Sequence, residues 1–132
     1  MELPEWAIAD WQRVLESGEW TSEMMCQRLL QRIEEVDVSG PTLRSVIEVN
    51  PDTLEIAASL DDERRSHQVR GPLHGIPVVV KDSLDTADRM MTTGGSLALS
   101  GNYAERDATV VRRLREAGAV LLAKTNMSEW GY

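Results

Sequence analysis

The chain has 132 residues, the size of one ordinary domain and enough to bury a core. Its 14 basic and 22 acidic residues give a net charge of -8, which argues against a nucleic-acid backbone or an anionic membrane surface as the main partner. The single cysteine, Cys26, excludes an internal disulfide and a multi-cysteine metal site, and we expect it to pack as a small apolar residue.

Two amphipathic helices are predicted at the start of the chain. In the first, Pro4 suits the first helical turn and Gly18 ends the helix. Its apolar residues recur at helical spacing: Trp6, Ala7, Trp11, Val14 and Leu15. Thr21 or Ser22 can cap the second helix, which we expect to run for about four turns. The apolar stripe of this second helix comprises Met25, Leu29, Ile33 and Val36.

A strand and a third helix are predicted next. Residues 43–49 alternate apolar and polar side chains, which is typical of a half-buried strand. Asn50 is the predicted cap of the third helix, with Pro51 at its first position. The inner edge of this helix is expected to include Leu54, Ala57, Ala58 and either Leu60 or Asp61. The run DDERR, residues 61–65, is most simply a solvated face.

The second half predicts two buried strands joined by a helix. GPLHGIP, residues 71–77, is rich in glycine and proline and is a predicted loop. It leads into Val78-Val79-Val80, and AVLLA at 119–123 forms a second continuous apolar run. Asp107 can cap the helix between them, which Gly118 would end. Apolar strands joined by a helical crossover are typical of a parallel pair covered by helices, so we predict an α/β layered fold.

Lys81 and Lys124 are the only lysines, and each follows one of the two apolar runs. If the strands are parallel, both lysines lie at carboxyl ends, where open α/β sheets bind ligands. The simplest interpretation is that each stem covers apolar surface while the ammonium reaches water. Catalysis would instead need a neutral lysine, whose pKa must fall by about 3.4 units through burial. The hydrophobic pattern does not separate these two interpretations.

The other chemical signals are weaker. Residues 92–96, TTGGS, are interpreted as a plain turn, with an anion-cradling turn as the alternative. His74 is expected to have a structural hydrogen-bonding role. Asp85 and Asp88 are too few for a dedicated metal cage, so no metal site is predicted.

Several segments together resemble the amidase signature family, a group of serine hydrolases that cleave amide bonds. The segments are GPLHGIPVVVKDSLDT, MTTGGSLAL and DATVVRRLREAGAVLLAKTNMSEW, and the resemblance covers nearly all 132 residues. It implies the N-terminal part of a layered amidase-signature fold, with helices packed on a mixed, largely parallel sheet. Residues 1–132 would form one incomplete domain. Residues 1–70 would be its helical region with one strand, and residues 71–132 the start of its α/β core.

The resemblance also implies site residues. The family uses a serine, a cis-serine and a lysine, and Lys81 matches the catalytic lysine. Lys124 matches a motif without that role, so it is interpreted as structural or as lining the site. A motif near the active site is matched by residues expected to bind substrate or support the site: Thr93, Gly94, Gly95 and Ser96. No cofactor is implied.

The family's two catalytic serines lie downstream of its KTNxSEW motif, whereas this sequence stops at Tyr132. We therefore expect a fragment truncated before those serines and inactive alone, and we expect exposed sheet edges to favour self-association. The complete protein would act on a small-molecule amide. No apolar run is long enough to span a bilayer and no signal peptide is visible, so a cytoplasmic location without membrane contact is expected.

Three alternatives stay open. Within the family, hydrolysis of a small or aryl amide competes with a glutaminase role like that of the family's amidotransferase subunit, which releases ammonia from glutamine. From another class, the chain could be a non-catalytic α/β binding or interaction module derived from the same fold. A phosphate- or nucleotide-binding domain using Thr93 to Ser96 lacks the lysine-bearing loop that such domains need.

Overall fold

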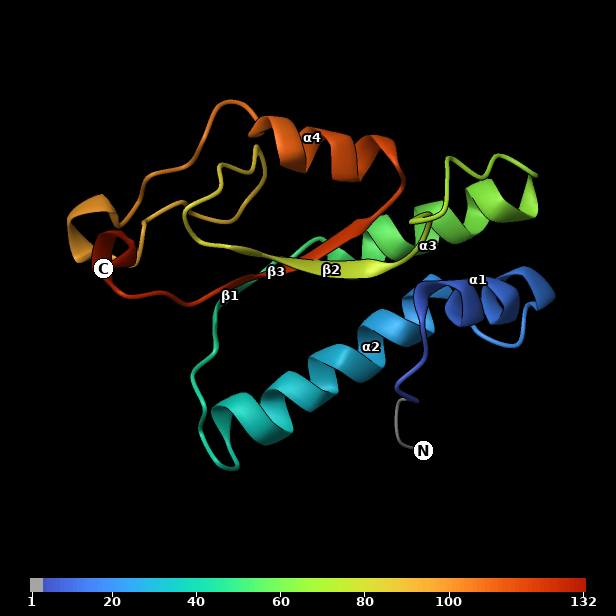
Figure 1. The fold of residues 1–132 in the computed structure, drawn as a ribbon, viewed down its shortest axis with the longest axis horizontal. Coiled ribbons are helices and arrows are strands. Elements are labelled where there is room, and N and C mark those ends of the chain that lie inside the picture. The colour runs from blue at the N-terminus through green and yellow to red at the C-terminus, as the bar shows by residue number, and fades with distance from the viewer. Residues whose placement is uncertain (1–3) are drawn as a thin grey trace.

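A computed structural model describes residues 4–132 and contains four α-helices packed on a three-stranded sheet (Figure 1). The α-helices are α1 (Ile8–Ser17), α2 (Ser22–Arg32), α3 (Thr53–Arg65) and α4 (Thr109–Glu116). The strands are β1 (Val46–Val49), β2 (Pro77–Lys81) and β3 (Val120–Thr125). The π-helical segment η1 (Ile33–Val38) continues α2, and the 3-10 turns η2 (Leu97–Leu99) and η3 (Glu129–Gly131) lie near the C-terminus.

Strand β3 lies at the centre of the sheet, in the order β1-β3-β2. Strand β2 runs parallel to β3, as predicted from the two apolar runs, and β1 runs antiparallel to β3. The sheet is therefore mixed, and the α/β prediction is confirmed. Every residue of β3 from Val120 to Lys124 is buried, because helices cover both faces of this strand.

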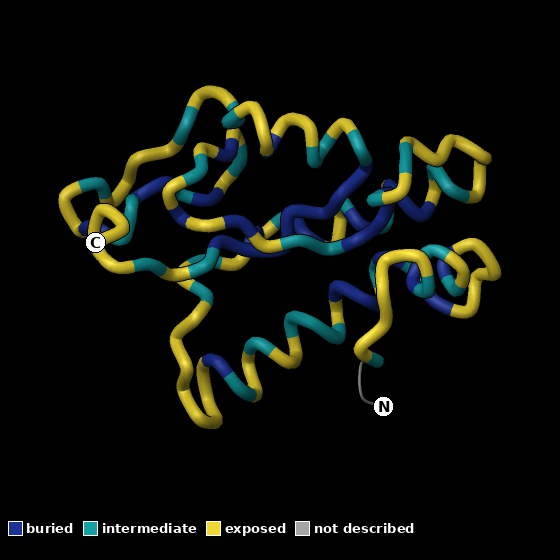
Figure 2. Tube along the Cα trace, in the orientation of Figure 1, coloured by how far each residue is buried: buried dark blue, intermediate teal, exposed yellow. Residues whose placement is uncertain are grey.

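The helices form a layer on each face of the sheet (Figure 1). On the α4 side, Val111 packs with Val80 and Leu121. On the other side, α2 and α3 bury a cluster with β3: Cys26, Ala57, Leu60, Val120, Leu122 and Ala123. Figure 2 shows the buried trace running along β3 between these layers. Cys26 packs as the predicted small apolar residue, and burial raises the pKa of its thiol to about 12.

Helix α1 packs beside α2 through a tryptophan cluster. Trp11 and Trp20 are buried, with ring centroids 5.4 Å apart, and Trp6 lies 5.0 Å from Trp11 while staying exposed. Gly18 ends α1 in the left-handed conformation that the sequence predicts, with φ 76°. The helix begins later than predicted, at Ile8 rather than near Pro4, because the Asp10 carboxylate accepts the Ala7 N–H at 3.1 Å.

The start of α3 also differs from the prediction. The helix begins at Thr53, and the Asn50 side chain accepts the Asp52 N–H at 3.0 Å while donating to the Leu121 carbonyl at 2.8 Å. Asn50 therefore ties the helix to β3 rather than serving as its cap. Leu54 is exposed, and the buried position in this first turn belongs to Thr53.

Helix α4 has no side-chain cap, so the prediction for Asp107 is wrong. The Asp107 carboxylate accepts the Ala87 N–H at 2.7 Å and the Arg115 Nε–H at 3.0 Å instead. These contacts fasten the loop before α4 to the segment that follows β2.

No helix described from residue 4 onward combines the length and apolarity needed to cross a membrane.

Asp61 joins α3 to the start of α2. Its carboxylate accepts the Ser22 N–H at 2.8 Å and the Glu23 N–H at 3.0 Å. These are N–H groups that the first turn of a helix cannot satisfy, and the positive end of the helix favours the negative charge. Asp61 and Leu60 are both buried, as expected for the inner edge of α3. Asp61 therefore does not belong to the solvated face predicted for residues 61–65, whereas its neighbour Asp62 is exposed.

We predict that Asp61→Asn lowers the free energy of unfolding by about 1–3 kcal/mol, because an amide nitrogen would then face the α2 N–H groups. The matched control, Asp62→Asn, changes the same charge at an exposed position and should stay within about 0.5 kcal/mol of the wild type. Urea unfolding followed by tryptophan fluorescence measures both. Equal effects of the two variants would contradict the capping role of Asp61.

Asp37 anchors the chain just before β1. Its carboxylate accepts the Ser45 N–H at 2.8 Å, the Val46 N–H at 3.0 Å and the Ser45 hydroxyl. The hydrogen bond from the Ser45 hydroxyl, followed by those from the backbone N–H groups, lowers the pKa of Asp37 from its usual 3.8. The folded state therefore binds this proton less readily than the unfolded state does.

Asp37 should make stability pH-dependent in acid. A lowered folded-state pKa stabilises the fold above the unfolded-state pKa of about 4, and this contribution is lost as pH falls through the folded-state value. Unfolding titrations of wild type and Asp37→Asn from pH 7 downward should therefore differ near neutrality and converge in acid. A gap that stays constant across this pH range would rule out the carboxylate as its source.

Candidate functional site

The candidate site lies at the carboxyl ends of β2 and β3, where the sequence places its two lysines. Lys81 is the last residue of β2 and pairs with Thr125, while Lys124 pairs with Val80. Side chains alternate between the faces of a strand, so Lys81 and Lys124 leave the sheet on opposite faces. The structure thus brings the two lysines to one edge of the sheet but not to one another.

Lys81 is exposed at this edge. A catalytic role for Lys81 would need burial to lower its pKa, and three valines precede it in β2. Of the three valines in β2, only Val80 is buried, and it packs against α4. Val79, which shares a face with Lys81, is 47% exposed. Strand β2 therefore does not provide the apolar surroundings that a neutral lysine needs.

Lys124 is fully buried. Its ammonium donates hydrogen bonds to the Met91 carbonyl and to the Thr92 hydroxyl, each at 2.7 Å. Burial lowers the pKa of Lys124, and the negative charges of Asp82 and of more distant acids oppose this shift. These contacts fit the interpretation of Lys124 as structural, because its donors hold the segment that leads into residues 92–96.

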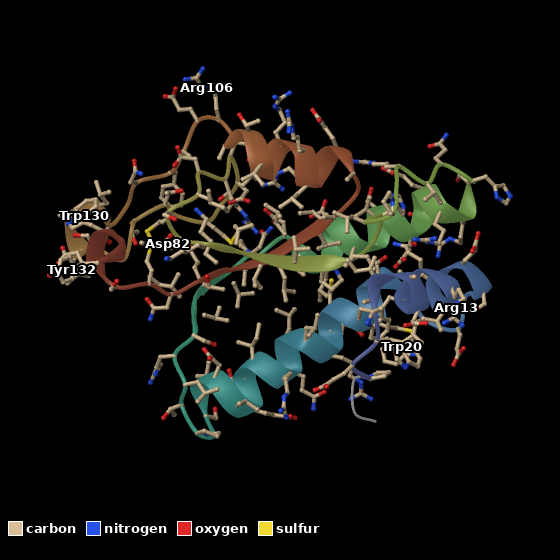
Figure 3. All side chains as sticks on the ribbon, in the orientation of Figure 1. Arg13, Trp20, Asp82, Arg106, Trp130 and Tyr132 are labelled. Atoms are coloured by element: carbon tan, nitrogen blue, oxygen red, sulfur yellow. The ribbon has the colours of Figure 1, made fainter. Side chains whose placement is uncertain are left out.

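Asp82 is a site residue that sequence reasoning missed. Its buried carboxylate accepts the Thr93 N–H at 3.2 Å, the Gly95 N–H at 3.3 Å and the Thr93 hydroxyl. Figure 3 shows Asp82 among the loops at this end of the sheet. A glycine-rich turn whose N–H groups need acceptors is the signal that could have pointed to a nearby acid.

The turn at residues 92–96 is filled by this internal carboxylate. Gly94 and Gly95 have left-handed φ angles of 58° and 72°, and a Cβ at Gly95 would lie 2.7 Å from the Met127 carbonyl. The Gly94 N–H donates to the Asp82 carbonyl at 3.2 Å, and the Ser96 N–H donates to the Thr93 carbonyl at 3.0 Å. The N–H groups are therefore already used, which favours a plain turn over a cradle for an external anion.

The same turn contacts the C-terminal segment. The Ser96 hydroxyl donates to the Glu129 carboxylate at 2.6 Å, and the Trp130 N–H donates to the Gly94 carbonyl at 2.8 Å. Figure 3 shows Trp130 on the outer side of this region. The predicted residues from Thr93 to Ser96 are thus brought next to the end of β2 through Asp82, with the C-terminal segment on their other side.

His74 lies at the opposite end of β2, before Pro77. Its Nδ1 accepts the Arg70 N–H at 3.2 Å, which leaves Nε2 as the donor to the Leu60 carbonyl at 2.9 Å. The ring is fully buried, so the predicted structural role of His74 is confirmed.

Asp88 binds Arg115 at 2.6 Å, and residues 4–132 contain no cluster of three His, Cys, Asp or Glu side chains that could hold a metal ion.

Comparisons with known proteins agree on one family. The sequence model of the Amidase family matches residues 25–132. An amidase-family protein of Schizosaccharomyces pombe is 46% identical over 128 residues, covering 97% of this chain and 21% of that protein. A subunit of the glutamyl-tRNA(Gln) amidotransferase of Halorhodospira halophila is 44% identical over 123 residues, covering 93% of this chain and 25% of that protein.

The fold gives the same answer. The crystal structure of the peptide amidase from Stenotrophomonas maltophilia superposes with a TM-score of 0.92 and 53% sequence identity. That match covers 96% of this chain and 26% of the peptide amidase, so the chain spans about a quarter of the length of this relative. The sequence and the fold thus agree, and this chain belongs to the Amidase family.

Proposed function

We propose that the protein is an amidase-type hydrolase that cleaves carbon–nitrogen bonds of amides, and that Lys81 is the base of a Ser-cisSer-Lys relay. The observation that carries the proposal is the contrast between the two lysines. Lys124 is buried and its ammonium is committed to Met91 and Thr92, whereas Lys81 ends β2 with an exposed side chain beside the turn at residues 92–96. Lys81 also occupies the family's lysine position in PVVVKD.

In the proposed reaction, neutral Lys81 accepts a proton from the nucleophilic serine through the cis-serine. The serine oxygen then attacks the amide carbonyl while backbone N–H groups hold the oxyanion. The proton on Lys81 returns through the cis-serine to the leaving amine as the carbon–nitrogen bond breaks. Water then hydrolyses the acyl-enzyme. Both serines belong to a downstream segment in this proposal, and the described chain contributes the lysine.

The proposal makes a demand on that downstream segment. A neutral lysine requires removal from water, and β2 leaves Lys81 exposed. Residues beyond 132 must therefore pack over the carboxyl end of β2 and bury the amine against the substrate pocket. Sequencing the gene past codon 132 tests this part directly, since an in-frame glycine- and serine-rich segment supports the enzyme. A natural stop would instead support the non-catalytic α/β module.

The substrate class is proposed from the relatives. The peptide amidase is 53% identical to this chain, and the amidotransferase subunit is 44% identical. The higher identity favours hydrolysis of an amide, with amides of peptides among the candidates, over a glutaminase role within an amidotransferase. Release of ammonia or amine from a peptide amide, an aryl amide and glutamine separates the two roles in one assay of the complete gene product.

We predict that Lys81→Ala lowers kcat of the complete gene product at least about 100-fold, because general-base catalysis contributes that much or more. The 132-residue chain alone should release no ammonia. The matched control is Lys124→Met, which removes the other lysine while keeping an apolar stem of similar length. This control should lower stability through the Met91 carbonyl left without its donor, and spare more activity than Lys81→Ala.

Two results would contradict these assignments. Full turnover in Lys81→Ala with an intact fold would end the proton-relay assignment. Amide hydrolysis by the purified 132-residue chain, abolished by Lys81→Ala, would show that no downstream serine is needed.

We further propose that the 132-residue chain self-associates through its sheet edges. Among the described strands, β1 and β2 each pair only with β3, and Ile47 and Val79 are exposed on these edge strands. Open edges with apolar side chains favour pairing with another chain. Sedimentation of the isolated chain should show association that increases with concentration. A monomeric profile with a cooperative thermal transition would contradict this.

A further inference from the structure

We infer that Asp82 is a positioning residue of this site, whose buried carboxylate is the internal anion that fixes the turn at residues 93–95 against the end of β2. The role of Asp82 in ordering the turn is inferred from its contacts and does not depend on the proposed function. The expected effect on turnover does rest on the proposed function, through the neighbouring Lys81.

The side chain of Asp82 gathers the donors of the turn. The Thr93 N–H, the Thr93 hydroxyl and the Gly95 N–H all point at its two oxygens. The residue is 1% exposed, so water does not replace these donors when they are lost. Hydrogen bonds to a buried carboxylate are stronger than those between neutral groups. This one carboxylate therefore accepts three of the hydrogen-bond donors of the turn.

Lys124 fixes the residues just before the turn. Its ammonium donates to the Met91 carbonyl and the Thr92 hydroxyl, so an anion and a cation hold adjacent parts of one segment. Among the acids that oppose the burial effect on Lys124, Asp82 contributes most. Asp82 is thus the acceptor for the turn, and its negative charge also raises the pKa of the buried lysine against the effect of burial.

The backbone of Asp82 transmits this order to Lys81. The Asp82 N–H donates to the Thr125 carbonyl at 3.1 Å, and the Asp82 carbonyl accepts the Gly94 N–H at 3.2 Å. The peptide that follows Lys81 is therefore held between β3 on one side and the turn on the other. Releasing the turn removes one of these two restraints, and the end of the edge strand β2 gains freedom.

The test uses hydrogen exchange and kinetics on variants of the complete gene product. Asp82→Asn keeps the shape of the side chain but removes its charge and one acceptor. Thr93→Val removes only the hydroxyl donor to Asp82, so it tests the same contact if Asp82→Asn does not fold. Asp85→Asn is the matched control, because Asp85 is exposed and carries the same charge three residues further along.

We predict that the amides of residues 93–96 exchange at least about tenfold faster in Asp82→Asn, with a smaller effect in the same direction for Thr93→Val. Asp85→Asn should match the wild type. With an amide substrate, Asp82→Asn should lower kcat about 100-fold while KM changes less than about threefold, since misplacing Lys81 affects the reaction more than substrate binding. Lys81→Ala should abolish turnover and leave exchange of the turn unchanged.

The exchange measurements and the kinetics test the two roles of Asp82 separately. Unchanged exchange in folded Asp82→Asn, or in Thr93→Val if Asp82→Asn does not fold, overturns the ordering role. Faster exchange with wild-type kcat overturns the positioning role. If the wild-type gene product hydrolyses no amide, the proposed function fails, and the exchange measurements still decide whether Asp82 orders the turn.

Discussion

A fully buried ammonium group at the end of the central strand is the constraint on which the candidate site depends. Removing a charge from water costs several kcal/mol unless hydrogen bonds and a countercharge replace the solvent. The Met91 carbonyl and the Thr92 hydroxyl accept hydrogen bonds from Lys124, and the negative charge of Asp82 opposes the effect of burial on its pKa. The segment that carries these acceptors must therefore cross the end of β3, which places the following turn beside β2.

The proposed function gives the two lysines different roles, Lys124 in structure and Lys81 in chemistry. Lys124 holds the segment that leads into the turn, and its hydrogen bonds are already made to Met91 and Thr92. Lys81, one residue pair further along the adjacent strand, is left exposed at the edge where open α/β sheets bind ligands. The family match covers residues 25–132 and so includes both lysines. What the strand does not provide is an apolar cover for Lys81.

Much of the fold could be predicted because it follows from local pattern. The apolar stripes of α1 and α2, the left-handed Gly18 and the parallel pair formed by two apolar runs all depend on residues close in sequence. The predictions that were wrong depended on distant partners. Asp107 was expected to cap α4 but binds Ala87 and Arg115, and Asp61 caps α2 from a different helix. Likewise, the hydrophobic pattern placed both lysines at strand ends. Only Lys124 is buried, because the segment with Met91 and Thr92 contacts its ammonium, and that contact is distant in sequence.

Chemical labelling of the two lysines tests the central claim most directly. The complete gene product would be treated with acetic anhydride, folded and then unfolded, and the peptides containing Lys81 and Lys124 would be quantified by mass spectrometry. We predict that Lys81 is acetylated in the folded protein, because a site that admits an amide substrate also admits this small reagent. Lys124 should be acetylated only after unfolding, because its amine is buried and bonded to Met91 and Thr92. Acetylation of Lys124 in the folded protein at the rate of Lys81 would contradict the division of roles between them.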